Sequence, residues 1–412
     1  MTYDVSAVRA QFPALAGGTA HFDGPGGSQT PRSVAHAVAS TLGSSIANRG
    51  TVTAAERRAE EIVVAAREAM GDLLGTDPAT VIFGRSMTAN TMDLARTLAR
   101  SQGWGPGDEV VVTSLDHDGN VRPWVIAAEA VGATVRWAEL DPQTGELPPA
   151  HVEAVLSGRT RLVAVTGAGN LVGTRPDLPA IIESAHAAGA LVHVDAVHLA
   201  AHAAVDREAL DADLLACSPY KFFGPHLGVT AGRADLLEQL RPDKLLPSPD
   251  RVPERFELGT LPYELLAGTT AAVDFIAGLA ELAGVAAPDH AGRPRRERLV
   301  ASFAALEHHE DTLRERAEAG LTGIDGVTVW SRAARRTPTL LFTLDGVEPA
   351  AVHRHLADLG VNAPASHFYA WECSHRLGLG AGGGVRVGMA PYSTAEEVDR
   401  LLEGVSELAR RR

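Results

Sequence analysis

Apolar residues recur along the chain at two different spacings, and their alternation predicts repeated strand–helix units. From about residue 54 to 75 they recur at helical spacing, and VIFGRS then reads as a short strand before a helix over SMTANTMDLARTLAR. Later units predict strands EVVVTS, TVRWAEL, RLVAVTG, ALVHVDA and DLLACSP, with helices at about 121–131, 148–156 and 176–189. This pattern favours an α/β fold with a mostly parallel sheet of the seven-stranded type, whose ligands bind beyond the carboxyl ends of the strands.

The pattern changes after a Pro-rich passage, KLLPSPDRVPERFELGT. A helical stretch follows at about 263–320, and then strands VTVWS, TLLFTL and GGVRVGM alternate with helices at 349–359 and 394–409. We therefore predict an N-terminal arm or part of the small domain at 1–20, a large domain at 21–265, and an interdomain helix with a small α+β domain at 266–412. A length of 412 residues accommodates both domains.

Composition narrows the class of function. Hydrophobic residues make up 45% and charged residues 21% of the chain, and no apolar run approaches the roughly 20 residues of a membrane span. A net charge of −14 disfavours a nucleic-acid partner. The first residues do not resemble a secretory signal, and two cysteines cannot build a disulfide framework, so we expect a cytoplasmic protein. Chemistry on a small molecule is the class that remains.

Lysine is rare in this chain, which contains only Lys221 and Lys244. Lys244 lies in a polar, Pro-rich stretch and is expected to face solvent. Lys221 follows a predicted strand and is flanked by Phe222 and Phe223. Desolvation there would lower its pKa and expose a neutral, nucleophilic amine, as Schiff-base chemistry with pyridoxal 5′-phosphate (PLP) requires. The alternative is a lysine whose stem packs on apolar surface while its amine reaches water.

Asp195 ends the predicted buried strand one unit earlier, on the same face as His193. A carboxylate at this place can pair with the protonated ring nitrogen of PLP, which Lys221 would hold. It can also cap a helix. A metal site formed with His193 and His198 is a third interpretation, but no further ligand cluster lies nearby at recognisable spacing, so we predict no metal.

Three other strand ends carry polar residues that suit the same cofactor. Thr88 opens a helix whose backbone N–H groups favour a phosphate. His117 leaves the end of EVVVTS and can stack on a flat ring, although a loop histidine is often incidental. Asn170 follows RLVAVTG and can donate a hydrogen bond to a phenolate oxygen.

Taken in order, these elements resemble the class V aminotransferase family, whose fold is the aspartate aminotransferase-like fold type I of PLP enzymes. The likeness is to its cysteine desulfurase-like branch and extends from about residue 20 to the C-terminus. It rests on HFDGPGGSQTP, ANRGT, SMTAN, LDHDGN, AGNLVGT, FELGT and GGVRVGMAPYSTAEEVDRL. In this family PLP is bound at the interface of a homodimer with shared sites, which the resemblance therefore implies here.

The resemblance also implies a role for each matching residue. The residues expected to bind PLP are Met87, Thr88, His117, Asn170, Asp195, His198, Ser218, Tyr220, Lys221 and Thr260, and of these Lys221, Asp195 and His117 are expected to be catalytic. His198 stands where relatives often carry glutamine, and Tyr220 where many carry histidine. Thr260 is expected to reach the phosphate of the neighbouring subunit. Arg386 is expected to bind the substrate carboxylate, a task that suits its bidentate fork, unless it is a surface ion-pair residue.

The sequence departs from the cysteine desulfurase pattern before the arginine motif. Those enzymes carry a nucleophilic cysteine on a loop there, but PASHFYAWECSH places Tyr369 at the matching position and Cys373 a few residues later. Nothing in the sequence lowers the pKa of Cys373, and a neutral thiol is a poor nucleophile. Persulfide formation is therefore in doubt.

These residues predict a PLP enzyme that acts on an amino acid. We favour a C–S lyase that performs β-elimination on cysteine or an S-conjugated cysteine, with Lys221 as general base and Arg386, Asn48, Gly26, His367 and Tyr369 on the substrate side. Cysteine desulfuration, transamination, epimerisation and decarboxylation with deamination share the early steps and stay open. A catalytically silent PLP-binding partner protein is the alternative from another class.

Overall fold

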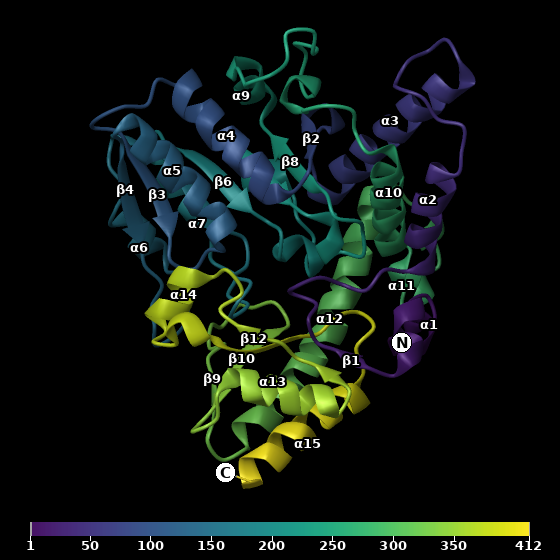
Figure 1. Cartoon of the computed structure of the whole chain (residues 1–412), viewed down its shortest axis with the longest axis vertical. Helices are drawn as coiled ribbons and strands as arrows, with labels where there is room; N and C mark the ends of the chain where they lie inside the picture. The colour runs from purple at the N-terminus through teal and green to yellow at the C-terminus, as the bar shows by residue number, and fades with distance from the viewer. Residues whose placement is uncertain (1, 412) are drawn as a thin grey trace.

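A seven-stranded sheet forms the centre of the larger part of the molecule (Figure 1). The computed structural model describes residues 2–411. The sheet contains β2 (Val81–Gly84), β3 (Glu109–Thr113), β4 (Thr134–Ala138), β5 (Thr160–Thr166), β6 (Leu191–Asp195), β7 (Leu214–Cys217) and β8 (Gly228–Gly232). Their order is β2-β8-β7-β6-β5-β3-β4, and β8 is antiparallel to both neighbours while the other pairs are parallel. The predicted α/β fold with a mostly parallel sheet is confirmed.

Helices cover both faces of this sheet because successive strand residues point to opposite sides. Val163 and Val165 of β5 belong to one buried apolar cluster, whereas Leu162 and Ala164 belong to another. The first cluster includes residues of α3 (Ala54–Leu74), α7 (Leu178–Ala187) and α10 (Tyr263–Ala277), and the second includes residues of α4 (Met87–Ser101), α5 (Arg122–Val131) and α9 (Ala234–Gln239). The short helix α6 (Pro149–Glu153) lies between β4 and β5 in the chain, and the short helix α8 (Arg207–Leu210) lies between β6 and β7.

A smaller, antiparallel sheet occupies the other end of the molecule. Its four strands are β12 (Ala365–Ser366), β13 (Gly384–Gly388), β10 (Thr339–Leu344) and β9 (Val327–Val329), in that order. Helices α13 (Pro349–Asp358) and α15 (Ala395–Arg411) pack on it around a separate apolar cluster. The structure therefore has the predicted α+β arrangement after the long helices.

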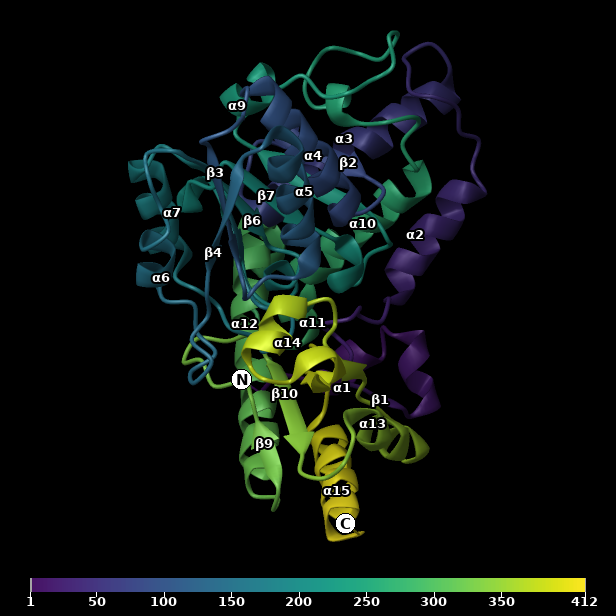
Figure 2. The same ribbon diagram turned by 60° about the vertical axis from the view of Figure 1, so that its left-hand side comes forward.

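One long helix, α12 (Arg295–Thr322), connects the two sheets, and both views show it running from one to the other (Figures 1 and 2). Its first half contributes Leu299 and Phe303 to the core of the large sheet. Its second half contributes Leu313 and Leu321 to the core of the small sheet. The domain boundaries at residues 20 and 265 stay a prediction.

The N-terminal segment crosses between the two parts. After α1 (Val5–Arg9), strand β1 (Ala20–His21) pairs in parallel with β11 (Val361–Asn362), and α2 (Arg32–Leu42) then packs against α10. The segment between β1 and α2 therefore starts beside the small sheet and ends on the large part.

The structure corrects several predicted elements. β8 was not predicted as a strand, and the stretch PASHFYAWECSH, which was matched to a cysteine-bearing loop of related enzymes, runs into the short helix α14 (Trp371–Arg376). The helical stretch predicted at about 263–320 is interrupted after α10 by α11 (Leu279–Leu282) and by the Pro-containing turn that precedes α12. Among the described residues, no helix combines the length and the apolar character that a membrane crossing requires.

Candidate active site

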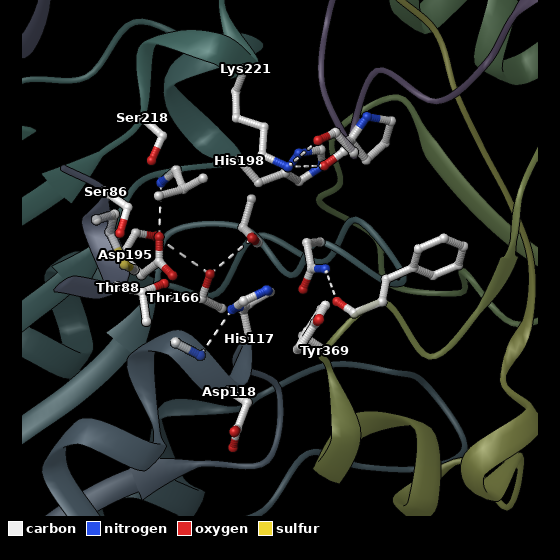
Figure 3. Close-up of a pocket in the computed structure, with 18 of the residues that line it drawn as sticks. Ser86, Thr88, His117, Asp118, Thr166, Asp195, His198, Ser218, Lys221 and Tyr369 are labelled. Atoms are coloured by element: carbon white, nitrogen blue, oxygen red, sulfur yellow. Dashed lines mark hydrogen bonds between the residues drawn. The ribbon is translucent and has the colours of Figure 1, made fainter. Parts of the chain in front are cut away.

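A cavity of about 630 Å³ opens at the carboxyl ends of β5, β6 and β7, between the large sheet and the small one. Figure 3 shows Ser86, Thr88 and Ser218 on one side of it and Tyr369 on the other, with His117 between them. Twelve of the predicted site residues line this cavity: Gly26, Met87, Thr88, His117, Asn170, Asp195, His198, Ser218, Tyr220, Lys221, Tyr369 and Arg386.

Lys221 ends the short turn that follows β7, and its amine enters the cavity. Its Nζ donates hydrogen bonds to the carbonyl oxygens of Pro25 and Gly26, the latter at 3.0 Å. Burial, and secondarily the positive charge of Arg386, lower the pKa of Lys221 to about 7. A large fraction of this amine is therefore neutral near neutral pH.

Asp195 is the last residue of β6, and its side chain lies on the cavity floor. The Val197 N–H donates to Oδ1 at 2.9 Å. Burial nevertheless raises the pKa of Asp195 to about 6. A cationic ligand atom beside this carboxylate would restore its charged form, since opposite charges stabilise each other strongly at a buried site.

Hydroxyl groups gather at the start of α4. Ser86 caps this helix by accepting from the Ala89 N–H at 3.1 Å, and Thr88 follows in the first turn. Ser218 is buried after β7 and faces the same region (Figure 3). A Cβ on Gly228 would lie 2.1 Å from the carbonyl carbon of Ser86, so this glycine of β8 allows the loop before α4 to approach the sheet. Hydroxyls and unpaired helix N–H groups together suit an anion such as a phosphate.

His117 stands at the end of the loop that follows β3, where its Nδ1 accepts a hydrogen bond from the Gly119 N–H at 2.9 Å. Burial, and then the charge of Lys221, lower the pKa of His117 to about 4. The ring is therefore neutral at physiological pH. Its centroid lies 5.6 Å from that of Tyr369, and the two rings are tilted against each other. The cavity is thus lined on this side by a flat neutral ring.

Arg386 projects from β13 and is almost fully buried. It donates to the Asn170 carbonyl at 3.1 Å and to Oδ1 of Asp23 at 2.8 Å, and its guanidinium carbon lies 3.7 Å from the centroid of the Phe368 ring. Its Nε has no hydrogen-bond partner among the described residues. This arrangement leaves a planar, buried cation with donor capacity toward a carboxylate.

The loop between β12 and α14 carries Tyr369 to the cavity in an unusual conformation. Phe368 and Tyr369 both have positive φ angles, 49° and 58°. Asn170 Nδ2 donates to the Phe368 carbonyl at 2.9 Å, and the Asp118 N–H donates to the Tyr369 carbonyl at 2.7 Å. Bulky residues in the left-handed region carry backbone strain, and these two hydrogen bonds offset it. They hold Tyr369 at the cavity, where 69% of the residue is exposed.

Three predicted site residues do not line the cavity of their own chain. Asn48 and Thr260 are exposed, and the loops around them are joined by Arg49, which pairs with Glu60 at 2.8 Å and with Glu254 at 3.2 Å. The role expected for Thr260 at the phosphate of a neighbouring subunit and the role expected for Asn48 on the substrate side stay predictions. His367 packs its ring against Trp371 at 5.1 Å instead of entering the cavity.

The residues considered for a metal have separate partners. His193 Nδ1 lies 2.8 Å from Oδ1 of Asn120, and His198 Nε2 contacts the hydroxyls of Thr337 and Thr339. Within residues 2–411 no group of three or more His, Cys, Asp or Glu side chains is arranged to hold a metal ion.

Both cysteines are fully buried. Cys373 lies in α14, and burial raises the pKa of its thiol to about 12. Cys217 lies in β7, and burial raises its pKa as well. Neither residue lines the cavity, so no cysteine among the described residues presents a thiolate there.

Sequence reasoning missed several cavity residues, the most important of which is Asp23. Asp23 belongs to HFDGPGGSQTP, a segment that was recognised as an opening turn but whose carboxylate received no role. Its contact with Arg386 joins residues 363 positions apart. The other missed lining residues include Ser86, Met92, Asp118, Arg122, Thr166, Ser366 and Phe368. Local spacing gives no signal for such residues, because the small sheet brings some of them to the cavity.

Comparison with known proteins gives consistent results. Residues 20–401 match the family model described as aminotransferase class-V. The chain is 34% identical over 409 residues to an uncharacterised protein of Mycobacterium tuberculosis, covering 99% of this chain and 100% of that protein. It is 29% identical to a cysteine desulfurase of Pectobacterium atrosepticum, over 100% of this chain and 99% of the relative. The solved structure of the cysteine desulfurase CsdA from Escherichia coli superposes with a TM-score of 0.85 at 27% identity, covering 100% of this chain and 99% of that one.

Proposed function

The chain belongs to the class V aminotransferase family of PLP-dependent enzymes, and from this premise we propose that it is a C–S lyase acting on cysteine or an S-conjugated cysteine. In the proposed reaction one water is consumed, the Cα–H and Cβ–S bonds of the substrate break, and a thiol, pyruvate and ammonium are released. The observation that carries the proposal is that Lys221, whose pKa is lowered to about 7, and the buried Arg386 line one cavity, whereas neither Cys217 nor Cys373 lines it.

The cavity residues fit PLP in their chemistry. Lys221 offers an amine of lowered pKa, and Asp195 offers a buried carboxylate that a protonated ring nitrogen would stabilise. Asn170 Oδ1 and His198 Nδ1 are buried and have no hydrogen-bond partner within residues 2–411, so these atoms offer the cavity hydrogen-bonding capacity that the described residues do not use. The hydroxyls of Ser86, Thr88 and Ser218 with the start of α4 suit the phosphate, and the neutral ring of His117 suits stacking on the pyridine.

When bound, PLP withdraws electrons from the bonds at Cα of an amino acid joined to it. The chain's own residues then have three tasks. Arg386 binds the substrate carboxylate and so orients the Cα–H bond, and the released amine of Lys221 removes the Cα proton. Asp195 keeps the positive charge on the ring nitrogen. Departure of sulfur from Cβ needs no protein thiol.

The two buried cysteines separate this proposal from the desulfurase reading that the similar proteins suggest. Desulfuration by a protein persulfide needs a thiolate that reaches the substrate sulfur, and Tyr369 stands at the cavity where the sequence comparison expects that cysteine. The pKa of Cys373, raised to about 12, leaves almost no thiolate at pH 7. We therefore favour elimination, with desulfuration as the second candidate because two of the similar proteins named above are cysteine desulfurases.

The experiment that tests the proposal supplies the purified, PLP-loaded protein with cysteine and with S-substituted cysteines and measures pyruvate, ammonia, thiol, sulfide and alanine together. Equal amounts of pyruvate, ammonia and thiol support the lyase. Formation of alanine and a protein-bound persulfide would show that the enzyme is a desulfurase and not a lyase. Conversion of a keto acid to an amino acid would show that it is an aminotransferase. PLP binding without turnover of any amino acid would indicate a silent binding protein.

We also propose a homodimer with shared sites, because the exposed loops at Asn48 and Thr260 match family segments that contact the neighbouring subunit. The ion pair of Arg49, next to Asn48, with Glu254, in the segment that leads to Thr260, supports this proposal because it joins the two loops. Sedimentation that shows a fully active monomer would contradict it.

A further inference from the structure

The carboxylate of Asp23 already pairs with the guanidinium that the proposed reaction assigns to the substrate. Nη2 of Arg386 donates to Asp23 Oδ1 at 2.8 Å, and both residues line the cavity. The proposed reaction gives Asp23 no task. A substrate carboxylate that binds Arg386 must therefore enter a place where a carboxylate of the chain itself is the existing partner.

Arg386 needs a negative partner because its side chain is almost fully buried. Among the described residues Asp23 is the one carboxylate that forms an ion pair with it. Removing one partner of a buried pair leaves an uncompensated charge, which strongly destabilises the folded protein. The empty site therefore needs Asp23. A site that holds a substrate carboxylate does not, because the substrate supplies the negative charge.

The side chain of Asp23 can leave Arg386 without unfolding its surroundings. Within residues 2–411 its carboxylate has no other hydrogen-bond partner, and part of it is accessible to solvent. The backbone of Asp23 is held separately, because its carbonyl accepts from the N–H groups of Gly26 and Gly27, each at 2.9 Å. The carboxylate can therefore turn toward solvent while the backbone keeps its place.

Arg386 has other contacts that remain when Asp23 turns away. Its Nη1 donates to the Asn170 carbonyl at 3.1 Å, and its guanidinium carbon lies 3.7 Å from the centroid of the Phe368 ring. Two carboxylates beside one guanidinium repel each other, and this repulsion is strong where water is largely excluded. The substrate carboxylate and that of Asp23 should therefore compete for the same cation.

We propose that Asp23 is an internal stand-in for the substrate carboxylate, which neutralises Arg386 in the empty site and yields it when an amino acid binds. This inference rests on the substrate-binding role proposed for Arg386 and adds the residue that sets how tightly the arginine binds. The affinity for a substrate carboxylate is then the difference between two competing interactions with one cation. Asp23 lowers that affinity and stabilises the empty protein.

The test measures how tightly propionate binds to the PLP-loaded protein. Propionate has the carboxylate of an amino acid but no amine, so it cannot react with the cofactor. The melting temperature is followed against propionate concentration in a buffer free of other carboxylates, with propionamide as the uncharged comparison. We expect Asp23→Asn to bind propionate about 10-fold more tightly than the unsubstituted protein and to melt at a lower temperature when propionate is absent.

Two further variants separate the position of this carboxylate from its charge. A Cβ on Gly26 would lie 2.4 Å from Asp23 Oδ1, so Gly26→Ala forces the carboxylate out of its place without removing its charge. It should also tighten propionate binding. Asp118→Asn removes a carboxylate of the same cavity that pairs with Arg122 at 3.1 Å, and it should leave the propionate affinity within about twofold. An equal tightening in Asp118→Asn would show a general effect of charge and would overturn the inference.

Arg386→Gln shows whether the arginine is the shared partner, because it should weaken propionate binding and cancel the effect of Asp23→Asn. Equal or weaker binding in a folded Asp23→Asn protein, with Arg386→Gln still weakening it, would overturn the inference and leave Arg386 as the clamp. If Asp23→Asn does not fold, Gly26→Ala decides by the same criterion. Propionate binding that does not depend on Arg386 in any variant would overturn both the inference and the role proposed for Arg386.

Discussion

Arg386 and Asp23 form a partly buried contact in which the guanidinium donates to the carboxylate at 2.8 Å, between the small sheet and the N-terminal segment. The Arg386 side chain is 2% exposed, while that of Asp23 is 34% exposed. The arginine is therefore desolvated, whereas part of the aspartate side chain remains accessible to solvent. A substrate carboxylate entering the cavity would meet a cation whose position is already determined by Asn170, Asp23 and Phe368.

Arg386→Lys should lower kcat/KM for amino-acid substrates by about 10- to 100-fold, since a single ammonium cannot keep the contacts of a planar fork and also bind a carboxylate in bidentate fashion. Steady-state kinetics on the PLP-loaded protein checks this. Arg316→Lys is the matched control, because Arg316 is half exposed and pairs with Asp399 far from the cavity. A decrease in kcat/KM no larger than that of the control would show that Arg386 does not bind the substrate.

Lys221→Ala should reduce turnover by a factor of at least about 100, because it removes the general base, and should abolish cofactor retention after borohydride treatment. Lys244→Ala is the control within the same chain. Lys244 is the other lysine, and its amine bonds to the Ser248 carbonyl at 2.9 Å in a loop outside the cavity. Retained turnover in Lys221→Ala would contradict the role assigned to Lys221. Loss of turnover in Lys244→Ala instead would assign that role to Lys244.

The rate at which cofactor-free protein captures PLP should rise with pH around a midpoint near 7. The sign follows from the lowered pKa of Lys221: below about 7 the amine is protonated and cannot attack, and above it the neutral form dominates. Stopped-flow absorbance at a series of pH values measures the midpoint. Arg386→Gln should move the midpoint upward, since the charge of Arg386 contributes to lowering the pKa. A midpoint near 10.5, the ordinary value for lysine, would show that the amine is not desolvated.

Cys373→Ala should leave the release of pyruvate and thiol from S-substituted cysteines within about twofold of the unsubstituted rate, because its thiol is buried and away from the cavity. The melting temperature reports any packing loss separately, since a buried side chain is shortened. Combining this change with Cys217→Ala removes every thiol of the chain. If persulfide and alanine form in the unsubstituted protein and disappear in Cys373→Ala, the enzyme is a desulfurase and α14 must move.

Sequence reasoning placed the elements best where local signals agree. The helix over Ala54–Leu74 begins with a capping box between Thr53 and Glu56 and ends at Gly75 in the left-handed conformation, and its predicted bounds differ by about one residue. β8 was missed because its sequence GVTAG contains two glycines and one β-branched apolar residue, so the usual strand signal is weak. Pairing with β2 and β7 stabilises it instead.

The same contrast holds for the site. Lys221 and Asp195 were found because each follows a strand whose apolar pattern is evident, and parallel strands bring their carboxyl ends together. The Asp23–Arg386 contact depends on the register between β13 and its neighbours, and the left-handed turn at Phe368 and Tyr369 depends on hydrogen bonds from Asn170 and Asp118. Neither kind of relationship is expressed in residue spacing.

The positions of the site residues along the chain determine when the site can form during synthesis. Pro25 and Gly26 accept the hydrogen bonds of Lys221, and Asp23 accepts that of Arg386. A ribosome that has translated residues up to Lys221 has made the lysine and its backbone acceptors, but β13 with Arg386 is still missing. The growing chain can therefore assemble the lysine's turn long before it can assemble the clamp, so the pocket is completed only when nearly the whole polypeptide has left the ribosome.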